Sequence, residues 1–101
     1  MNKAGEGFKI ISDSFTDKKK HITAIPDPLV CCNRIDFDII DGKLHDLIYV
    51  KGCNGNLKAL GRLLEGADIK EAARLLRGVD CKGRGTSCTD QLAKIIESIG
   101  A

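Results

Sequence analysis

The spacing of apolar residues changes along the chain, from alternation in the first half to helical spacing in the second. Residues 35–39 alternate apolar and charged side chains, which predicts a strand with one buried face. Asp41-Gly42 comes next, and this dipeptide favours a type I′ hairpin turn. Residues 44–50 then form the return strand. Because the second half of that strand is apolar on both faces, we predict a central strand with a helix over one face.

Three segments beyond residue 56 repeat apolar residues at intervals of three and four, which predicts amphipathic helices. The first is capped by Asn56, the second by Asp68 and the third by Ser87, and a glycine follows each of the first two. The residues predicted to face inward are Leu57, Leu60, Leu63 and Leu64, then Ile69, Ala72, Leu75 and Leu76, then Leu92, Ile95, Ile96 and Ile99. The order of strands and then helices predicts an α+β fold, a small antiparallel sheet with three helices packed on one face.

The N-terminal third has weaker patterns. Two short strands fit residues 8–11 and 21–25, with a loop over the polar residues 12–20. Two prolines then interrupt regular structure, because a proline lacks an N–H donor and has a fixed φ. We therefore predict that residues 1–28 form a partly flexible N-terminal extension and that residues 29–101 form the domain.

The composition limits the classes of function. The chain has 101 residues, enough for one modest core, and 43% of them are hydrophobic. The formal charge of +2 is too small to indicate binding to nucleic acid or to an anionic membrane, so we expect neither partner. No apolar run approaches the roughly 20 residues that span a bilayer, and no signal-peptide pattern opens the sequence. We therefore expect a cytoplasmic protein.

Five cysteines in a reducing compartment indicate metal binding or catalysis rather than a disulfide framework. Cys81 and Cys88 bracket a loop that contains two glycines. Cys88 falls in the first turn of the last predicted helix, where Ser87 is a suitable N-cap and Asp90 follows three residues later. Backbone N–H groups and the helix dipole favour the thiolate at this position. Cys53 lies in a similar loop with glycines, again just before a helix.

In a layout of strands followed by helices, these cysteine loops are expected to lie at one end of the sheet. A tetrahedral zinc site with thiolate ligands is the usual arrangement for such a cluster. Adjacent cysteines rarely bind one tetrahedral metal together, so Cys31 and Cys32 are expected to supply one ligand between them. The chain has no Cys-x-x-Cys pair, and its spacing also fits buried structural cysteines or a redox pair of Cys81 with Cys88.

Other groups carry weaker signals. His21 and His45 fit surface or strand histidines better than metal ligands. Residues 82–87, a loop with two glycines and two basic residues before a helix, could hold a phosphate, but they lack the residue order of a P-loop. No Ser/His/Asp set and no pair of buried carboxylates indicates hydrolytic chemistry.

Two segments carry a resemblance to a known family. They are Gly52-Cys53-Asn54-Gly55-Asn56-Leu57-Lys58-Ala59-Leu60 and Gly85-Thr86-Ser87-Cys88-Thr89-Asp90-Gln91-Leu92-Ala93. Together with the intervening helices they resemble the TSCPD domain family, and more narrowly its small stand-alone four-cysteine members. Thr89 occupies the place of the proline in the family's Thr-Ser-Cys-Pro-Asp motif, which removes a helix-start preference but leaves the cysteine in place. The resemblance covers about residues 30–100.

The resemblance implies four metal ligands, Cys31, Cys53, Cys81 and Cys88, with Cys32 as the extra cysteine and zinc as the expected metal. The domain also occurs at the C-terminal end of adenosylcobalamin-dependent ribonucleotide reductases, and stand-alone members are for that reason often labelled ribonucleoside-diphosphate reductase. A chain of this length has no room for the radical-generating barrel of such an enzyme. The resemblance therefore implies an accessory or binding role, with a ribonucleotide reductase or another protein as the partner.

Two alternatives stand beside the zinc-binding module. One is a thiol-redox module of ribonucleotide reduction, with Cys88 as the reactive thiolate. The other follows from a layout similar to iron–sulfur scaffold proteins of the IscU/NifU kind, which hold zinc or an iron–sulfur cluster with cysteines at one end of the fold. Chelation unfolds a domain that is built on structural zinc, a thiol relay is reactive without metal, and a scaffold becomes coloured with iron and sulfide.

Overall fold

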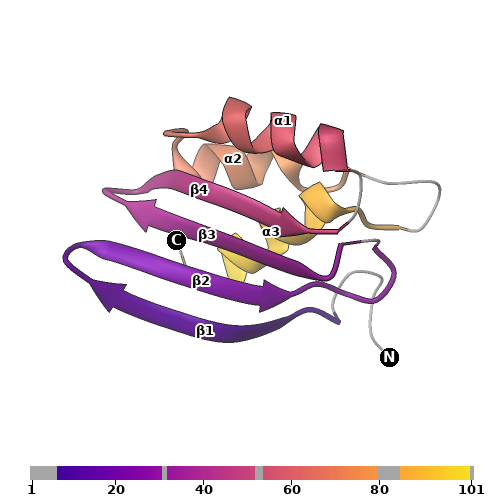
Figure 1. Ribbon diagram of the computed structural model, residues 1–101, viewed down its shortest axis with the longest axis horizontal. Coiled ribbons are helices and arrows are strands. Elements are labelled where there is room, and N and C mark those ends of the chain that lie inside the picture. The colour runs from indigo at the N-terminus through magenta and orange to yellow at the C-terminus, as the bar shows by residue number, and fades with distance from the viewer. Residues whose placement is uncertain (1–6, 31, 52–53, 80–84, 101) are drawn as a thin grey trace.

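Four antiparallel strands form one sheet, and their spatial order, β1-β2-β3-β4, is also their order in the chain. The structure, a computed structural model, describes residues 7–30, 32–51, 54–79 and 85–100. The strands and helices are β1 (Lys9–Thr16), β2 (Lys19–Ile25), β3 (Arg34–Ile40), β4 (Lys43–Val50), α1 (Asn54–Leu64), α2 (Ile69–Leu76) and α3 (Cys88–Ser98). This arrangement confirms the predicted α+β fold (Figure 1).

Two-residue turns join β1 to β2 and β3 to β4. Asp41 and Gly42 have φ angles of 52° and 73°, in the left-handed region that a type I′ turn requires, so the predicted hairpin is confirmed. Asp17 and Lys18 form the equivalent turn between β1 and β2, with φ angles of 51° and 65°. The prediction of a loop over residues 12–20 is wrong, because strands occupy all of this segment except the turn.

The side chains of β3 alternate between the two faces of the sheet, as predicted. Ile35 and Phe37 are 0% and 1% exposed and belong to the core. Asp36 lies between them in the sequence and Asp38 follows Phe37, so both aspartates point to the opposite face. From β2, Ile22 also enters the core, so the first hairpin is packed into the same sheet as the second.

Helix α3 closes the core. Its side chains Leu92, Ile95 and Ile96 are fully buried and belong to the cluster that contains Phe37 and Ile22. In Figure 1 this helix lies behind β2 and β3, whereas α1 and α2 lie above β4. Full burial of side chains of this size stabilises the fold by about 1.5–3 kcal/mol each. The inward face predicted for the last helix is confirmed.

The first two helices contact the rest of the molecule along narrower stripes than predicted. Helix α1 packs against β4, and α2 packs mainly against α3. Leu63 is 82% exposed and Leu75 is 59% exposed, so the prediction that both face inward is wrong. Asn56 is also not an N-cap, because α1 begins at Asn54. The cap predicted for α2 is confirmed, since the Asp68 side chain accepts from two amides of the first turn at 3.0 Å each.

Strand β4 lies at an edge of the sheet, so the prediction of a central strand is wrong. Its apolar residues on the two faces have different surroundings. Leu47 and Tyr49 pack against the core beneath α1, whereas Ile48 is 55% exposed. The continuous apolar run of β4 therefore reflects one covered face and an exposed isoleucine on the other. The same run would occur in a strand with both faces covered, so sequence alone does not distinguish the two cases.

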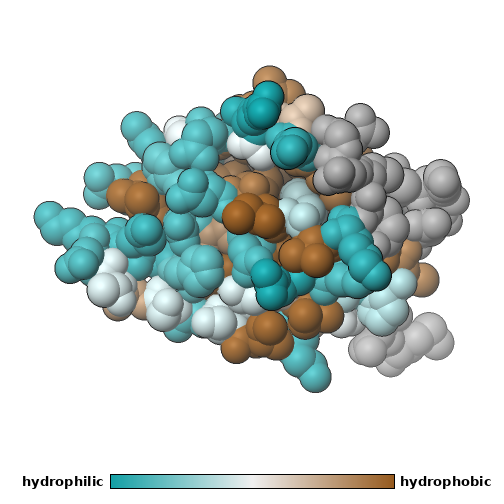
Figure 2. Space-filling view, viewed as in Figure 1, coloured by the Kyte–Doolittle hydropathy of each residue, from teal (hydrophilic) through white to brown (hydrophobic). Residues whose placement is uncertain are grey.

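The face of the molecule on which the sheet lies in front of α3 is mostly hydrophilic, with apolar side chains in separate small groups (Figure 2). The most exposed apolar residue of the sheet is Phe15 on β1. Within the described residues, no helix is long and apolar enough to cross a membrane.

Candidate functional site

The described residues include two of the five cysteines. Cys32 and Cys88 are 3% and 9% exposed, and neither is in a disulfide bond within the described part of the chain. Cys31, Cys53 and Cys81, three of the four predicted metal ligands, lie outside the described residues. The structure therefore places one predicted ligand, Cys88, together with the scaffold around it.

Cys88 is the first residue of α3, as the capping pattern predicted. Ser87 precedes it with an extended backbone, and the Ser87 side chain accepts a hydrogen bond from the Asp90 amide at 3.0 Å. The Ser87 hydroxyl donates to the carbonyl oxygen of Val79 at 2.5 Å. The capping serine therefore joins the start of α3 to the segment that follows α2.

The neighbours of Cys88 in the motif form a buried hydrogen-bond network. The Thr86 hydroxyl donates to Asp90 at 2.6 Å, and the Gly78 amide donates to the other Asp90 carboxylate oxygen at 2.7 Å. Gln91 donates to Thr86 at 3.0 Å and accepts from the Asp27 amide at 2.8 Å. This network ties α3 both to the end of α2 and to the connection between β2 and β3. The polar residues of the motif thus hold Cys88 in place.

Asp90 is ionised in this network although it is almost fully buried. Burial opposes its ionisation, but hydrogen bonds from Thr86 and the Gly78 amide, together with Lys94 at 3.2 Å, hold the pKa of Asp90 below its usual value. A buried carboxylate is stable only with such partners. The negative charge also lies in the first turn of α3, where the helix dipole favours it.

Tyr49 connects β4 to the start of α3. Its hydroxyl donates to the carbonyl oxygen of Cys88 at 3.0 Å. The pKa of Tyr49 is raised well above 10.0, chiefly by burial of the phenol and then by negative charge on Cys32 and Cys88. Both described cysteines therefore lie close enough to the phenol to act on its ionisation.

Hydrogen bonds between described residues bring the segments beside the other cysteines to the same region. The Asn33 amide donates to the carbonyl oxygen of Val50 at 2.7 Å, which joins the residues after Cys32 to the end of β4. Val50 is followed in the sequence by the segment that contains Cys53, and Val79 by the segment that contains Cys81. The hydrogen bond from Ser87 to Val79 and the one from Tyr49 to Cys88 join these segments to the start of α3. The described residues that flank each cysteine therefore lie near one another, where β4 ends and α3 begins.

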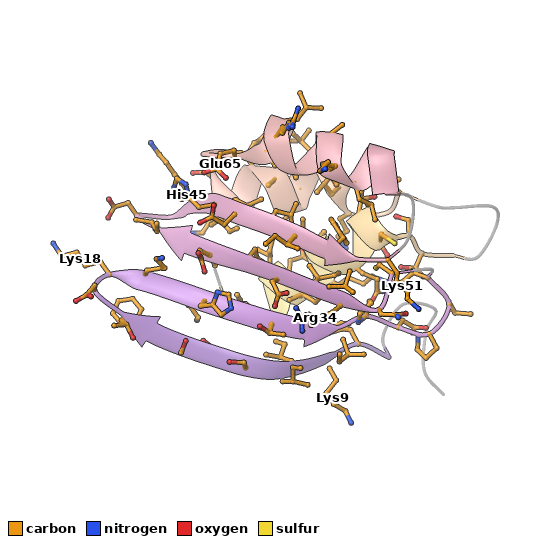
Figure 3. All side chains as sticks on the ribbon, in the orientation of Figure 1. Lys9, Lys18, Arg34, His45, Lys51 and Glu65 are labelled. Carbon is orange, nitrogen blue, oxygen red and sulfur yellow. The ribbon has the colours of Figure 1, made fainter. Side chains whose placement is uncertain are left out.

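The two histidines lie on strands and pair with carboxylates. His21 Nδ1 is 2.5 Å from Asp38 Oδ1, and the His21 side chain is 46% exposed. His45 Nδ1 is 2.6 Å from Glu65 Oε2, and Figure 3 shows these two residues facing each other across the gap between β4 and the end of α1. Among the residues that the structure describes, no group of three or more histidine, cysteine or acidic side chains is arranged to hold a metal.

A pocket of about 460 Å³ lies between β4 and α1. Its lining includes Lys58 and Arg62, which are one helical turn apart on α1. No sequence motif marked these two residues as part of a site. The only available signal was the four-residue spacing of two basic residues on a predicted helix, which by itself does not distinguish a pocket wall from ordinary surface.

Comparison with known proteins identifies a family. The model of the TSCPD domain family matches residues 11–99. The match begins earlier than the motifs, so it includes most of the β1–β2 hairpin as well as the second hairpin and the helices. No curated protein and no solved structure matches the chain.

Proposed function

The chain belongs to the TSCPD domain family, and on this premise we propose that it is a small metal-binding domain in which four cysteines hold one zinc ion. The proposed ligands are Cys31, Cys53, Cys81 and Cys88. We propose further that the zinc-bound domain has an accessory or binding role, linked to ribonucleotide reduction, and that it works in the cytoplasm.

The observation that carries this proposal is the position of Cys88. It begins α3, is 9% exposed, and sits where β4, α3 and the segment after α2 are hydrogen-bonded together. The described residues that flank the other three proposed ligands in the sequence lie in this same region. Four thiolates from separate segments at one end of a small sheet suit tetrahedral zinc, for which Zn–S distances are about 2.3 Å.

The donor set fits zinc chemically. Zinc in a closed tetrahedral site with four thiolates has a structural role and contributes to folding directly. The motif supports the ligand without competing for it. The Thr86 side chain donates to the Asp90 carboxylate, and the Ser87 hydroxyl bonds the Val79 carbonyl oxygen and the Asp90 amide. Such supporting hydrogen bonds hold a ligand residue in one position.

A thiol-redox module is less well supported. Thiol exchange requires an accessible sulfur as well as a thiolate, and Cys88 is almost fully buried. A cluster scaffold of the IscU/NifU kind uses the same thiolate donors, so the metal itself distinguishes it from the zinc domain.

The first experiment is elemental analysis of the chain purified without chelator, together with a count of reactive thiols in the native protein. We expect about one zinc per chain and protection of the ligand thiols. Each of Cys31→Ser, Cys53→Ser, Cys81→Ser and Cys88→Ser is expected to lower the zinc content strongly. Cys32→Ser is the matched control and is expected to retain zinc, because Cys32 is a buried core residue.

Other outcomes would change the assignment. Chain without metal and with reactive thiols contradicts the zinc domain and favours the redox module. Retention of zinc by Cys31→Ser and loss by Cys32→Ser would exchange these two residues as ligand. Visible absorbance after anaerobic reconstitution with iron and sulfide, with no zinc in the purified chain, favours the scaffold.

The accessory role needs a separate test. The zinc-loaded chain is titrated into a purified adenosylcobalamin-dependent ribonucleotide reductase that lacks its own TSCPD domain, and heat of binding and turnover are measured. Binding with a change in turnover supports the link. Absence of both effects contradicts the link to ribonucleotide reduction and leaves the zinc site itself standing.

A further inference from the structure

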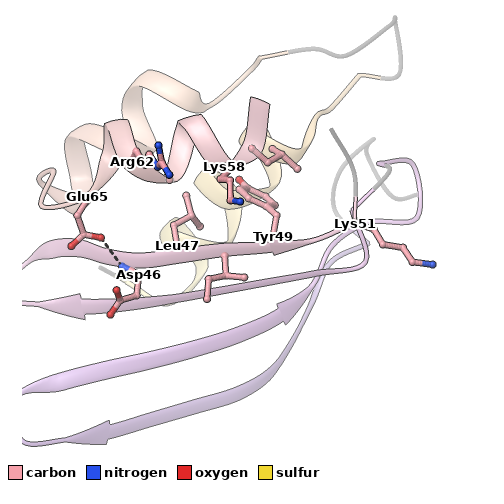
Figure 4. Close-up of a pocket in the computed structure, with 10 residues that line it drawn as sticks. Asp46, Leu47, Tyr49, Lys51, Lys58, Arg62 and Glu65 are labelled. Atoms are coloured by element: carbon pink, nitrogen blue, oxygen red, sulfur yellow. Dashed lines mark hydrogen bonds between the residues drawn. The ribbon is translucent and has the colours of Figure 1, made fainter. Parts of the chain in front are cut away.

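The pocket between β4 and α1, named here the β4–α1 pocket, has the composition of a site for a small organic anion. It has a volume of about 460 Å³, within the usual range for ligand pockets. Its apolar wall consists of Leu47, Tyr49 and Leu57 (Figure 4). Tyr49 presents its ring to the pocket while its hydroxyl is engaged with Cys88, so the ring offers a flat apolar surface.

The acidic residues of the lining do not oppose an anion in the pocket. Glu65 accepts a hydrogen bond from the Asp46 amide at 2.8 Å and pairs with His45 at 2.6 Å, so both of its carboxylate oxygens are already engaged. The Asp46 side chain points away from α1 in Figure 4. This orientation follows from a bulge in β4 opposite Phe37, where Asp46 has a φ of 53°.

Among the described residues, the basic side chains on the α1 side of the lining have no charged partner. Lys58 and Arg62 extend from the side of α1 that borders the pocket (Figure 4). Neither forms an ion pair or a hydrogen bond with another side chain in the part of the chain that the structure describes, whereas Arg74 on α2 and Arg77 just after it each pair with a glutamate. Two uncompensated cations beside an apolar wall create a positive potential in a partly enclosed space.

We propose that the β4–α1 pocket binds a small organic anion, namely a flat apolar or aromatic body that carries one carboxylate, sulfonate or phosphate group. The apolar body packs against Leu47, Tyr49 and Leu57, and the anionic group pairs with Lys58 and Arg62. Arginine suits this role because its planar group binds such anions through two parallel hydrogen bonds. The proposal rests on the lining of the pocket and gives a metal no part in contacting the ligand.

The probe is anilinonaphthalene sulfonate, which combines an aromatic body with one anionic group, and its uncharged analogue N-phenylnaphthylamine is the matched ligand control. Fluorescence titration of the chain as purified gives the affinity of each. Amide chemical shifts give the location. We expect saturable binding of the sulfonate, weaker binding of the uncharged analogue, and shifts centred on Leu47, Tyr49 and Gly61.

The matched variants test the charges. Lys58→Gln combined with Arg62→Gln is expected to weaken binding of the sulfonate about tenfold and to leave binding of the uncharged analogue unchanged. Lys70→Gln combined with Arg74→Gln removes the same charge with the same spacing from α2 and is expected to have little effect. All four residues are exposed, so the fold is retained, which circular dichroism checks.

The proposal is overturned if the chain shows no saturable binding of the sulfonate, if the shifts centre elsewhere, or if both double variants weaken binding equally. Equal binding of the charged and uncharged probes would also overturn it, because it would leave the cations without a role. A chain that carries no zinc when purified without chelator, but binds the sulfonate at this pocket, would contradict the proposed zinc site while supporting the pocket.

Discussion

The Tyr49 hydroxyl donates a hydrogen bond to the main-chain carbonyl oxygen of Cys88 at 3.0 Å. The bond joins the last strand of the sheet to the first residue of the last helix, across 39 positions of sequence. The same residue lines the β4–α1 pocket and lies close to Cys32 and Cys88. Tyr49 is the single tyrosine of the chain, so its ionisation can be followed without interference.

Ionisation of Tyr49 is expected to accompany alkaline unfolding. Its pKa in the folded chain is raised, first by burial and then by negative charge on Cys32 and Cys88. A raised pKa contributes stability below the unfolded value of about 10, and that stability is lost as the pH rises toward the folded value. A tyrosinate absorbance titration is therefore expected to show a midpoint above pH 10.0 that coincides with loss of secondary structure.

The control is Tyr49→Phe, which removes the phenol and the bond to Cys88. We expect it to lower the free energy of unfolding at neutral pH by about 1 kcal/mol, the usual contribution of one hydrogen bond. Its stability should also decrease less above pH 10.0 than that of the wild type. A wild-type absorbance midpoint at the ordinary tyrosine value, with the fold intact, would contradict the described surroundings of Tyr49.

Asp90 is expected to make the fold sensitive to acid. Its pKa is lowered in the folded chain, so its contribution to stability is present above the unfolded value of about 3.9 and is lost as the pH falls through the folded value. Asp90→Asn removes the negative charge and is expected to lower the free energy of unfolding at neutral pH by about 2 kcal/mol. Denaturant titrations below pH 5 should show a shallower loss of stability for the variant.

A matched control for Asp90→Asn is Glu71→Gln. Glu71 also has a lowered pKa, chiefly through its hydrogen bond with Arg74, but it lies on the exposed surface of α2. Solvent screens such surface pairs, so most of the acid sensitivity should remain in this variant. Equal effects of the two substitutions would show that the network around Asp90 does not hold its charge in the way described.

Gly61 sets the distance between α1 and β4. A Cβ atom at this position would lie 3.0 Å from the carbonyl oxygen of Leu47, a backbone atom that cannot move by side-chain rotation. Replacement of glycine by alanine in a helix normally stabilises by about 1 kcal/mol. In urea unfolding, Gly61→Ala is expected to show no increase in the free energy of unfolding, because the added methyl group pushes α1 away from β4.

The comparison for Gly61→Ala is Ala59→Gly, at an exposed position of the same helix. We expect Ala59→Gly to lower the free energy of unfolding by about 1 kcal/mol, the full difference in helix propensity between alanine and glycine. If Gly61→Ala instead gained as much as Ala59→Gly lost, the close approach of α1 to Leu47 would not constrain the fold.

The turn between β1 and β2 is expected to carry backbone strain at Lys18. Its φ of 65° is in the left-handed region, which costs a residue other than glycine roughly 1–2 kcal/mol. Lys18→Gly is expected to raise the free energy of unfolding by up to about 1 kcal/mol, because glycine's greater freedom in the unfolded chain offsets part of the relief.

Gly42→Ala is the reverse test in the other hairpin. Gly42 has a φ of 73°, and a Cβ atom there would meet no other atom within 4 Å, so the effect is purely conformational. We expect a loss of about 1 kcal/mol. If Lys18→Gly and Gly42→Ala changed the free energy of unfolding in the same direction, the left-handed geometry of one of the two turns would be contradicted.

Where a local signal decides the structure, the sequence predicted it. The Asp41-Gly42 turn, the Asp68 cap and the start of α3 after Ser87 were all predicted, since each depends on residues within one turn of chain. The turn at Asp17-Lys18 was not, because lysine rarely adopts positive φ and gives no turn signal. Its presence follows from pairing between β1 and β2, which acts over the whole hairpin.

Tertiary context explains the other errors. Leu63 and Leu75 have the spacing of inward residues, but nothing in the described structure covers the outer sides of α1 and α2. The sequence placed Cys88 in its helix but did not predict the Thr86–Asp90–Gln91 network, which depends on contacts with Gly78 and Asp27 far along the chain. The β4–α1 pocket was not predicted because it arises from the spacing between two elements.

The position of α3 in the chain has a consequence for how the protein folds. The sheet is assembled from neighbours in sequence, so its hairpins can form early from local contacts. The helix that covers Ile22, Ile35 and Phe37 is the last one in the described chain. During synthesis on the ribosome, the part of the apolar face formed by these three residues therefore remains uncovered until residues 88–98 emerge. The nascent chain is most prone to aggregation in that interval.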